Sequence, residues 1–481
     1  MSDSLSANSL SQPQRIVILV VGFLGWAFAG VQMSITSIAM RPATQDLMAR
    51  VDTLDRGAFL ELSKRSTAEK KAEKAGEEPT DPLTDAERDQ YESWRGNISE
   101  WYSWYVCAFL FGAAAGGLLF GRIGDQIGRK NAMAASIMCY SVFSLLGYFV
   151  QSPTQLLIIR FLTCLGIGGM WPNGVALVSE AWANLSRPMI AGVIGTAANV
   201  GIFGMSTWAK YKDVTPDDWR WTMIAGGAPI LLGLFSFFAV AESPMWLAAK
   251  GKGPTDDDDE YYNPDGDDDA GPKREYTTGD VFRSFLGVTV VGILLATVPL
   301  LGGWGSANWM SPWADEAGEI ANPPQPDLKA KVGQARSLTG TIGSFLGGWI
   351  ASIVGRKRTY FLISLGALFS AQYAFWFTVP TDSSFLFWVS ALGLFSGTFF
   401  GWLPLFLPEL FPTSIRSTGA GVSFNFGRIL TAVTVFATGA LKTLFDGDYA
   451  LIGRVTSLIY LVGMAVILLA PDTTDKNLED D

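Results

Sequence analysis

The chain has 481 residues, of which 49% are hydrophobic and only 17% are charged, and it contains 52 glycines and 17 tryptophans. A soluble chain would carry charge on about a quarter of its residues, whereas membrane helices use glycine and interfacial tryptophan freely. Its net charge is −10, it has no histidine, and its three cysteines lie in apolar stretches. This composition argues against the common zinc, haem and triad sites and against a disulfide framework. We therefore expect no soluble enzyme, nucleic-acid binder, metal or cofactor.

Twelve segments of mostly apolar residues follow one another along the chain. Each has about 20 residues, the length that crosses a bilayer as a helix. They start near Ile16, Trp101, Asn131, Thr154, Pro188, Trp221, Val281, Leu338, Thr359, Phe385, Ser417 and Ala450. The first segment is too long for the apolar part of a signal peptide and lacks a clear cleavage site. We expect an all-α integral membrane protein with twelve transmembrane helices.

Lysine and arginine gather in the short connections on one side of this arrangement, which the positive-inside rule makes the cytoplasmic side. These residues are Arg122, Arg129, Lys130, Arg187, Arg356, Lys357, Arg358 and Arg416. The short connections on the other side, around Ser152 and Thr381, hold none. Both termini are thus expected in the cytoplasm. We expect a multi-pass monomer in the lipid bilayer, in the inner membrane if the source is bacterial.

A polar stretch, residues 41–100, separates the first two segments and lies on the outer side in this orientation. Its parts LELSKRSTAEKKAEKAG (60–76) and AERDQYESW (86–94) consist largely of strong helix formers. They predict a small helical hairpin. The hairpin would cap the outer mouth, bind a partner or be a passive insertion, and passive insertion is our default interpretation.

The chain repeats two patterns at nearly one spacing. GRIGDQIGRK (121–130) recurs as GWIASIVGRK (348–357), 227 residues later, and a Glu seven residues before an Arg recurs after 229 residues. Agreement between two patterns predicts two pseudo-symmetric six-helix halves, as in rocker-type secondary transporters. We place the N-terminal half at 1–247, an acidic cytoplasmic linker at 248–280, and the C-terminal half with a short tail at 281–481.

The linker contains the acidic runs DDDDE (256–260) and DGDDD (265–269). A calcium loop would need an acidic first ligand where Tyr261 stands and a bidentate glutamate where Pro272 stands. We interpret the runs as a solvated linker without a metal.

Two basic residues stand apart from the other 33, which we assign to loops, tails and helix ends. Arg428 lies roughly 18 Å along its helix from Arg416, and Arg160 lies about two turns into its own. No acid falls within a predicted core segment. Two buried guanidinium groups without an acid favour an anion, which they bind bidentately. Alternatively, one of them caps carbonyls or faces an acid across the bundle.

Other candidates for the walls of a central cavity are less specific. Asn425 lies one turn before Arg428 on the same helix face. Gln32, Trp26, Trp304 and Trp309 are further candidates, although each tryptophan is as readily an interfacial anchor.

GRIGDQIGRK resembles the signature loop between helices 2 and 3 of the major facilitator superfamily, and RFLTCLGIGG (160–169) resembles its helix-4 motif. DDWRW (217–221), ESPMWL (242–247), PELFPTSIRSTGAG (408–421) and PDTTDKNLE (471–479) resemble one branch of it. That branch includes sugar porters, organic-ion transporters, metabolite–proton symporters and synaptic vesicle glycoprotein relatives. The resemblance covers nearly the whole chain except residues 41–100 and the linker.

The resemblance also implies roles for charged residues at the cytoplasmic face. In the family, matching residues form salt bridges that close the inner gate in the outward-facing state. The corresponding residues are Asp125, Arg129, Lys130, Glu180, Arg187, Glu242, Arg356, Glu409 and Arg416. The plain alternative for each is a topology signal, and for Arg129, Lys130, Arg356 and Lys357 we expect both roles.

Departures from the family pattern narrow the substrate. Sugar porters carry glutamine-rich motifs in helices 5 and 7, which here read IGTAANVGIFG and LGGWGSANWM. Proton-coupled relatives place an acid in helix 1 against the arginine that corresponds to Arg160, and here Ala29 and Gln32 stand in its place. FNFGR (424–428) is most similar to the metabolite symporters, which often carry organic acids.

We therefore expect a transporter that moves a small organic anion, a carboxylate or an aromatic acid, by alternating access. Arg160 and Arg428 would contact the anion. Uniport, exchange and symport stay open. The alternatives are a proton-coupled symporter of a neutral or cationic, sugar-like metabolite, and a receptor-like member that acts through its outer loop. No catalytic residue is assigned, because no nucleophile–base or metal constellation exists.

Overall fold

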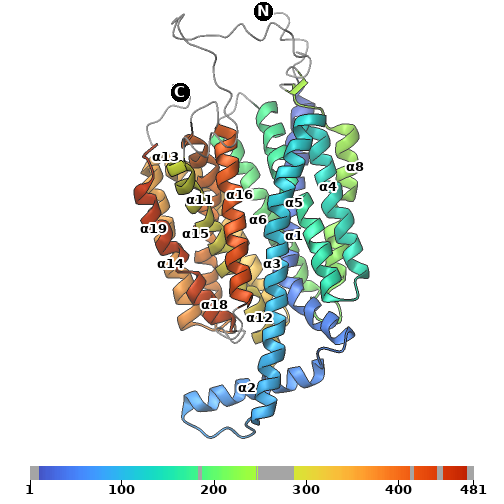
Figure 1. The fold of residues 1–481 in the computed structure, drawn as a ribbon, viewed down its shortest axis with the longest axis vertical. Helices are drawn as coiled ribbons and strands as arrows, with labels where there is room; N and C mark the ends of the chain where they lie inside the picture. Colours follow the sequence, from blue (N-terminus) through green and yellow to red (C-terminus); the bar gives the residue numbers. More distant parts are fainter. Residues whose placement is uncertain are drawn as a thin grey trace, which may run out of the picture.

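A computed structural model of the chain describes residues 10–182, 187–244, 246–247, 286–411, 416–440 and 448–473. Within these ranges the regular structure is entirely helical. Long helices run side by side and form one elongated bundle (Figure 1). The predicted linker at 248–280, with its acidic runs, lies outside the described residues.

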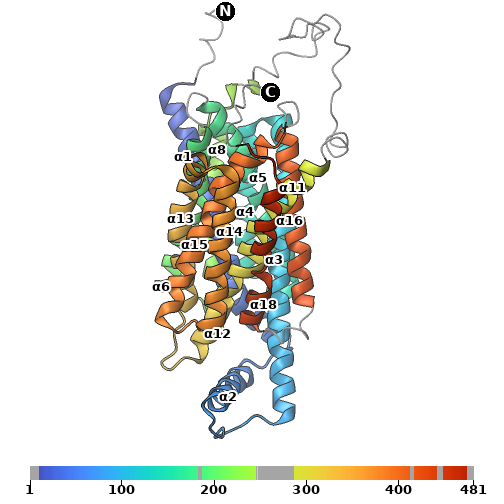
Figure 2. The same cartoon turned by 90° about the vertical axis from the view of Figure 1, so that its left-hand side faces the viewer.

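Within the described residues, the N-terminal half supplies six long helical rods and the shorter helix α2. The rods are α1 (Gln12–Arg50), α3 (Asp85–Ile127), α4 (Arg129–Leu146), α5 (Pro153–Ala181), α6 (Arg187–Tyr211) and the consecutive pair α7 (Trp221–Gly227) and α8 (Ile230–Ala239). The shorter helix, α2 (Arg56–Ala75), lies beyond one end of the bundle, next to the start of α3 (Figures 1 and 2). The helical hairpin predicted within residues 41–100 is confirmed.

The C-terminal half supplies six more rods. They are α11 (Leu286–Leu300) continued by α12 (Met310–Ile320), α13 (Leu328–Val354), α14 (Arg356–Phe377), α15 (Ser383–Glu409), α16 (Arg416–Ala440), and the pair α18 (Tyr449–Thr456) and α19 (Ile459–Leu469). Buried apolar side chains form two large clusters, one centred on each half.

Eleven of the described helical rods are long and apolar enough to span a membrane. The remaining rod is α6, whose side chains at 187–191 lie outside the described residues, and it packs closely against a neighbour. A Cβ on its Gly201 would overlap the carbonyl oxygen of Ala27, and a Cβ on Gly30 of α1 would overlap that of Ala198. Helix α6 also contacts α13 in the other half. The expected twelve-helix membrane fold is confirmed.

The two halves are related by a pseudo-twofold pattern of contacts. Helix α3 packs against α16, and α13 packs against α6. In each of these contacts, the second rod of one half meets the fifth rod of the other half. The repeated basic loop has a backbone reason. Gly128 and Gly355 have φ angles of 104° and 96° and both have ψ of 151°, in a region that side chains with a Cβ rarely adopt. The same sharp turn thus joins α3 to α4 and α13 to α14.

Several helices extend beyond the apolar segments that predicted them. Helix α13 begins ten residues before the expected Leu338, and α1 continues to Arg50. These extensions carry the buried charges of Arg41 and Lys329 and the partly buried Arg336. The prediction that only two basic side chains depart from loops, tails and helix ends is therefore wrong. A hydropathy pattern does not assign such charged turns to a membrane helix, because the scale scores a charged residue as unfavourable whether or not it is paired.

The close contact between α1 and α6 allows a matched test of glycine packing. We expect Gly201→Ala to lower the thermal unfolding midpoint of the purified protein, because the Ala27 carbonyl must move, at a cost of about 1–3 kcal/mol. The control is Gly204→Ala on the same helix, where a Cβ meets nothing within 4 Å. That change should leave the midpoint unchanged or raise it, since alanine favours a helix by about 0.5–1 kcal/mol. Equal midpoints for the two variants would contradict the close packing.

Candidate functional site

A cavity of about 510 Å³ lies between the two halves. Helices α1, α3, α5 and α6 line it from the first half, and α11, α13, α15 and α16 line it from the second. Most of its wall is apolar. The polar side chains on the wall are Asn199, Arg336, Ser337, Ser396, Asn425 and Arg428. None of the described lining residues is acidic.

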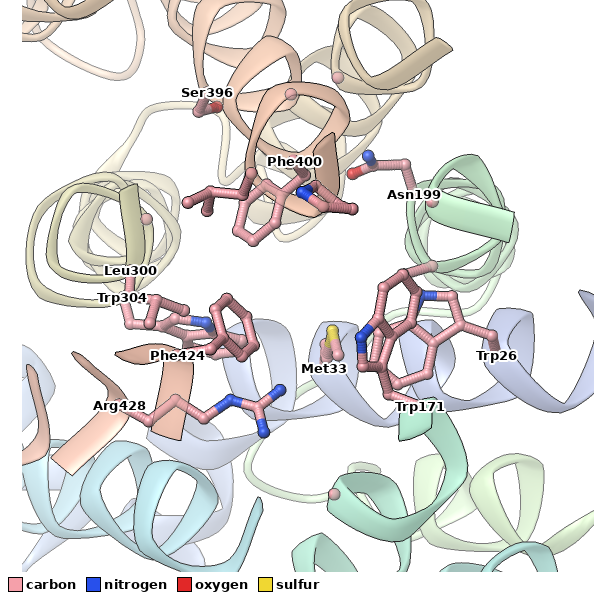
Figure 3. A pocket seen from close by; sticks show the side chains of 18 of the residues that line it. Trp26, Met33, Trp171, Asn199, Leu300, Trp304, Ser396, Phe400, Phe424 and Arg428 are labelled. Atoms are coloured by element: carbon pink, nitrogen blue, oxygen red, sulfur yellow. The ribbon is translucent and has the colours of Figure 1, made fainter. Parts of the chain in front are cut away.

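Aromatic rings form much of the wall. The rings of Trp26 and Trp171 lie 4.8 Å apart, and those of Phe109 and Trp304 lie 4.0 Å apart, measured between centroids. Figure 3 shows Trp26 and Trp171 across the opening from Trp304 and Phe424, with Phe400 on a third side. A flat, partly unsaturated molecule would find stacking partners here.

The helix from α11 to α12 changes its winding where it meets the cavity. Residues Leu301–Ser306 form a π-helical segment, and Ala307–Trp309 form a short 3₁₀ turn. Gly303, Trp304 and Ala307 from this stretch line the cavity. Irregular winding of this kind recurs at functional sites, and interrupted helices often build transporter binding sites.

Arg428 of α16 lines the cavity and points toward its centre (Figure 3). One of its nitrogens, Nη1, lies 3.5 Å from the carbonyl oxygen of Ala113, and its guanidinium lies 4.6 Å from the ring centroid of Phe424. Asn425, one turn earlier, also lines the cavity. Both contacts of Arg428 are weak, so its charge is available to a ligand.

Arg336 of α13 is a second basic residue on the cavity wall. Its Nη1 atom is buried and has no hydrogen-bond partner, although the group interacts electrostatically with Tyr102 and Tyr460. Neither Arg336 nor Arg428 forms an ion pair with a carboxylate in the described part of the chain. The cavity therefore holds two uncompensated positive charges.

Arg160 lies outside the set of residues that line the cavity. It is 1% exposed and donates hydrogen bonds to Gln32 Oε1 (2.9 Å), the Gln32 carbonyl oxygen (3.1 Å) and Thr36 Oγ1 (2.8 Å). Gln32 in turn donates to the carbonyl oxygen of Gly226 at 2.8 Å. Arg160 and Gln32 thus join α1, α5 and α7, and neither is among the residues that line the cavity.

The predicted cavity residues therefore divide into two groups. Trp26, Trp304, Asn425 and Arg428 line the cavity, whereas Arg160, Gln32 and Trp309 do not. Trp309 is buried between the rings of Tyr102 and Tyr449. Sequence reasoning missed Trp171, Asn199, Arg336, Ser396, Phe400 and Phe424. Arg336 could have been predicted from the sequence, because it lies only two residues before a predicted membrane segment.

The charges predicted to gate the cytoplasmic side form contacts within each half. Arg129 donates to Asp125 at 2.5 Å, and Glu242 accepts from the backbone N–H of Lys130 at 3.1 Å. Glu180 accepts a hydrogen bond from Ser243. In the second half, Arg356 binds Glu409 at 2.9 Å. The side chains of Arg187 and Arg416 lie outside the described part of the chain.

No group of three potential metal-ligating side chains occurs among the described residues. Cys107, Cys139 and Cys164 are free thiols. The binding chemistry that the described cavity offers is therefore electrostatic, aromatic and amide or hydroxyl hydrogen bonding.

Comparison with known proteins agrees with this architecture. The family model of sugar (and other) transporters matches residues 43–480. Among solved structures, a partially occluded, inward-open form of the Escherichia coli xylose transporter has a TM-score of 0.65 at 14% identity, covering 97% of this chain and all of the other. At that identity the likeness shows the fold alone.

Curated relatives are transport proteins of bacteria. The niacin transporter of Acinetobacter baylyi is 23% identical over 403 residues, covering 78% of this chain and 86% of the relative. The cis,cis-muconate transport protein of the same species is 23% identical over 343 residues, covering 69% and 76%.

The family match spans most of the chain, so this protein belongs to the sugar (and other) transporter family of the major facilitator superfamily. It is a multi-pass membrane transporter and not an enzyme.

Proposed function

For this member of the sugar (and other) transporter family we propose that the cargo is a small organic anion, a carboxylate or an aromatic acid, carried by alternating access. One observation carries the proposal. The cavity between the halves is lined by Arg336 and Arg428, and none of its described lining residues is acidic.

The physical argument rests on the low dielectric between the helices. A charge there is costly unless it is paired, so natural transmembrane helices keep such charges for ligands and ion pathways. A guanidinium group binds a carboxylate through two parallel hydrogen bonds. A carboxylate entering this cavity would therefore pair with the guanidinium group of Arg336 or with the weakly engaged group of Arg428.

The aromatic wall supports a flat cargo. The rings of Trp26, Trp171 and Trp304 line the cavity, and aromatic rings favour stacking on a flat cargo. Two relatives are named for niacin and cis,cis-muconate, and both of these compounds are planar, unsaturated carboxylates. The relatives and the cavity thus favour the same chemical class.

A sugar is the second candidate, because the family model bears that name and the similar solved structure is a xylose transporter. Against it, a sugar with several hydroxyls would have to use two amides and two serines on an otherwise apolar and cationic wall. A neutral sugar also leaves both guanidinium charges without a counter-ion. We therefore rank it below an anion.

The mode of coupling depends on which residues could carry a proton. The chain has no histidine, and the described cavity wall carries no carboxylate to bind a proton. We propose uniport, exchange, or symport in which the cargo itself carries the proton. Both termini would face the cytoplasm, and the unit would be a monomer.

Arg428 provides the first test, by uptake of labelled niacin or cis,cis-muconate into proteoliposomes. We expect Arg428→Gln to reduce uptake at least tenfold, because loss of a charged partner in a buried site costs about 2–5 kcal/mol. Arg428→Lys should retain part of the activity, since the charge remains but the two-point geometry is lost. The control is Arg454→Gln. Arg454 lies in α18, outside the cavity, and donates a hydrogen bond to the carbonyl oxygen of Phe375. Undiminished uptake in both Arg428 variants would contradict the assignment.

Variants of Arg336 and Arg160 distinguish a charge that binds the cargo from a charge that stabilises the fold. We expect Arg336→Gln to weaken binding of an organic anion, measured by the ligand-induced rise of the thermal midpoint, while leaving the ligand-free midpoint unchanged or higher. Removing an unpaired buried charge relieves a desolvation cost. Arg160→Gln should do the reverse and lower the ligand-free midpoint, because it breaks three hydrogen bonds. A stronger response to xylose than to the anions in wild-type protein would favour the sugar.

A further inference from the structure

Residues 51–100, called here the hairpin insert, form a small folded unit at one end of the bundle (Figures 1 and 2). Its two arms are α2 and the first turns of α3. Together with Met48 of α1, they bury a separate apolar cluster that includes Leu54, Phe59, Leu62 and Tyr91. The ends of α2 are defined by Asp55, which accepts from the backbone N–H of Ala58, and by Gly76 at φ 72°. A unit with its own core and caps positions charged side chains well.

The insert is attached to the N-terminal half by an ion pair. Arg56 donates two hydrogen bonds of 2.8 Å to Asp217, which lies in the connection between α6 and α7. The Arg56 guanidinium lowers the pKa of Asp217 below its usual range. Within the insert, Arg88 of α3 binds Glu69 of α2 at 2.7 Å. The Arg56–Asp217 pair holds the insert to the half from which it arises, and the Arg88–Glu69 pair holds its two arms together.

A different ion pair ties the insert to the C-terminal half. Arg95, on the first turns of α3, binds Glu316 of α12 through two hydrogen bonds of 2.7 and 3.0 Å. Their side chains are only 14% and 9% exposed. This bidentate, largely buried pair crosses from one half of the transporter to the other.

A second set of charges crosses the halves close by. Arg41 of α1 is 2% exposed and lies 3.0 Å from both Asp315 and Glu319, the latter at the end of α12. Lys329 of α13 binds Asp315 at 2.5 Å and donates to the carbonyl oxygen of Val214 in the N-terminal half. Three basic and three acidic side chains thus close the hairpin end, counting Arg95 and Glu316.

The opposite end of the bundle has a different pattern. There the described ion pairs join residues of the same half, Asp125 with Arg129 and Arg356 with Glu409. The cross-half ion pairs of the described residues lie at the hairpin end. The structure is thus held shut at that end.

We propose that the hairpin insert is a clamp that stabilises the closed state of this end, with the Arg95–Glu316 ion pair as its latch. Opening here requires α12 to move away from α1 and from the start of α3, which separates the latch and the Arg41 pairs. Separating the pair loses the attraction between its charges, and a charge that stays shielded from water without its partner is costly. The latch therefore biases the equilibrium between the two access states toward closure.

The latch is also connected to the cavity. Arg95 lies on the same continuous helix as Phe109, Leu110 and Gly117, which line the cavity. That helix packs against α16, the helix of Arg428. A cargo that shifts α3 against α16 would therefore strain the latch at the far end of the same rod. The insert is then a regulator of access rather than a passive loop.

Distance measurement between spin labels tests the clamp in the full chain without cargo. One label is attached at Asp213→Cys and the other at Thr381→Cys, exposed positions in hairpin-end connections of opposite halves. Protein without these two cysteines measures labelling of the native thiols. We expect Arg95→Gln and Glu316→Gln each to raise the ratio of long to short distances about tenfold. The charge-swapped double variant, Arg95→Glu with Glu316→Arg, should restore the wild-type distribution.

Glu69→Gln is the matched control, since it breaks an Arg–Glu pair inside the insert without touching the C-terminal half. It should leave the distances unchanged. The helical signal in circular dichroism identifies the variants that fold. If Glu316→Gln misfolds, the distances measured in Arg95→Gln test the latch. A wild-type distribution in the folded latch variants, or the same shift in Glu69→Gln, would overturn the proposal.

Discussion

Charge between the helices is the constraint on which the rest of the structure depends. An ionised group in this environment must have a partner, a ligand or a path to water. The chain solves this problem in three ways. Arg160 is satisfied by neutral oxygens of Gln32 and Thr36. Arg41 and Lys329 are satisfied by acids of α12. Arg428 has one long contact with the carbonyl oxygen of Ala113, and the Nη1 atom of Arg336 has no partner. Neither pairs with a carboxylate of the described residues, and both line the cavity.

The three solutions correspond to three jobs. The neutral network of Arg160 stays within one half, so it need not break when the halves move. The ion pairs of Arg41 and Arg95 cross the halves and must separate when the hairpin end opens. The cavity arginines keep their charge for the cargo. Such a division is physically consistent, because a transporter needs rigid halves, a separable contact between them and an unsatisfied site.

Glycine determines how closely the helices pack and where the chain turns. Helices that move as rigid halves must pack closely within each half, and the α1–α6 contact does so by removing side chains at Gly30 and Gly201. Gly128 and Gly355 serve a different purpose, since their positive φ angles turn the chain sharply at equivalent places in the two halves. The shared backbone conformation explains why GRK recurs after 227 residues. It also means that the repeat reflects geometry as well as charge.

By itself, the sequence determined the class of protein, the number of helices, the two halves and the hairpin, because these depend on the length and period of apolar runs and on local helix signals. It also identified Arg428, whose apolar neighbours on both sides make a charge conspicuous. The tertiary structure alone decided which buried arginine faces the cavity. Arg160 is equally conspicuous in the sequence, but Gln32, 128 residues away, occupies its donors. Arg336 and Glu316 were hidden because a polar turn at a helix end appears as a loop until its partner in another helix is known.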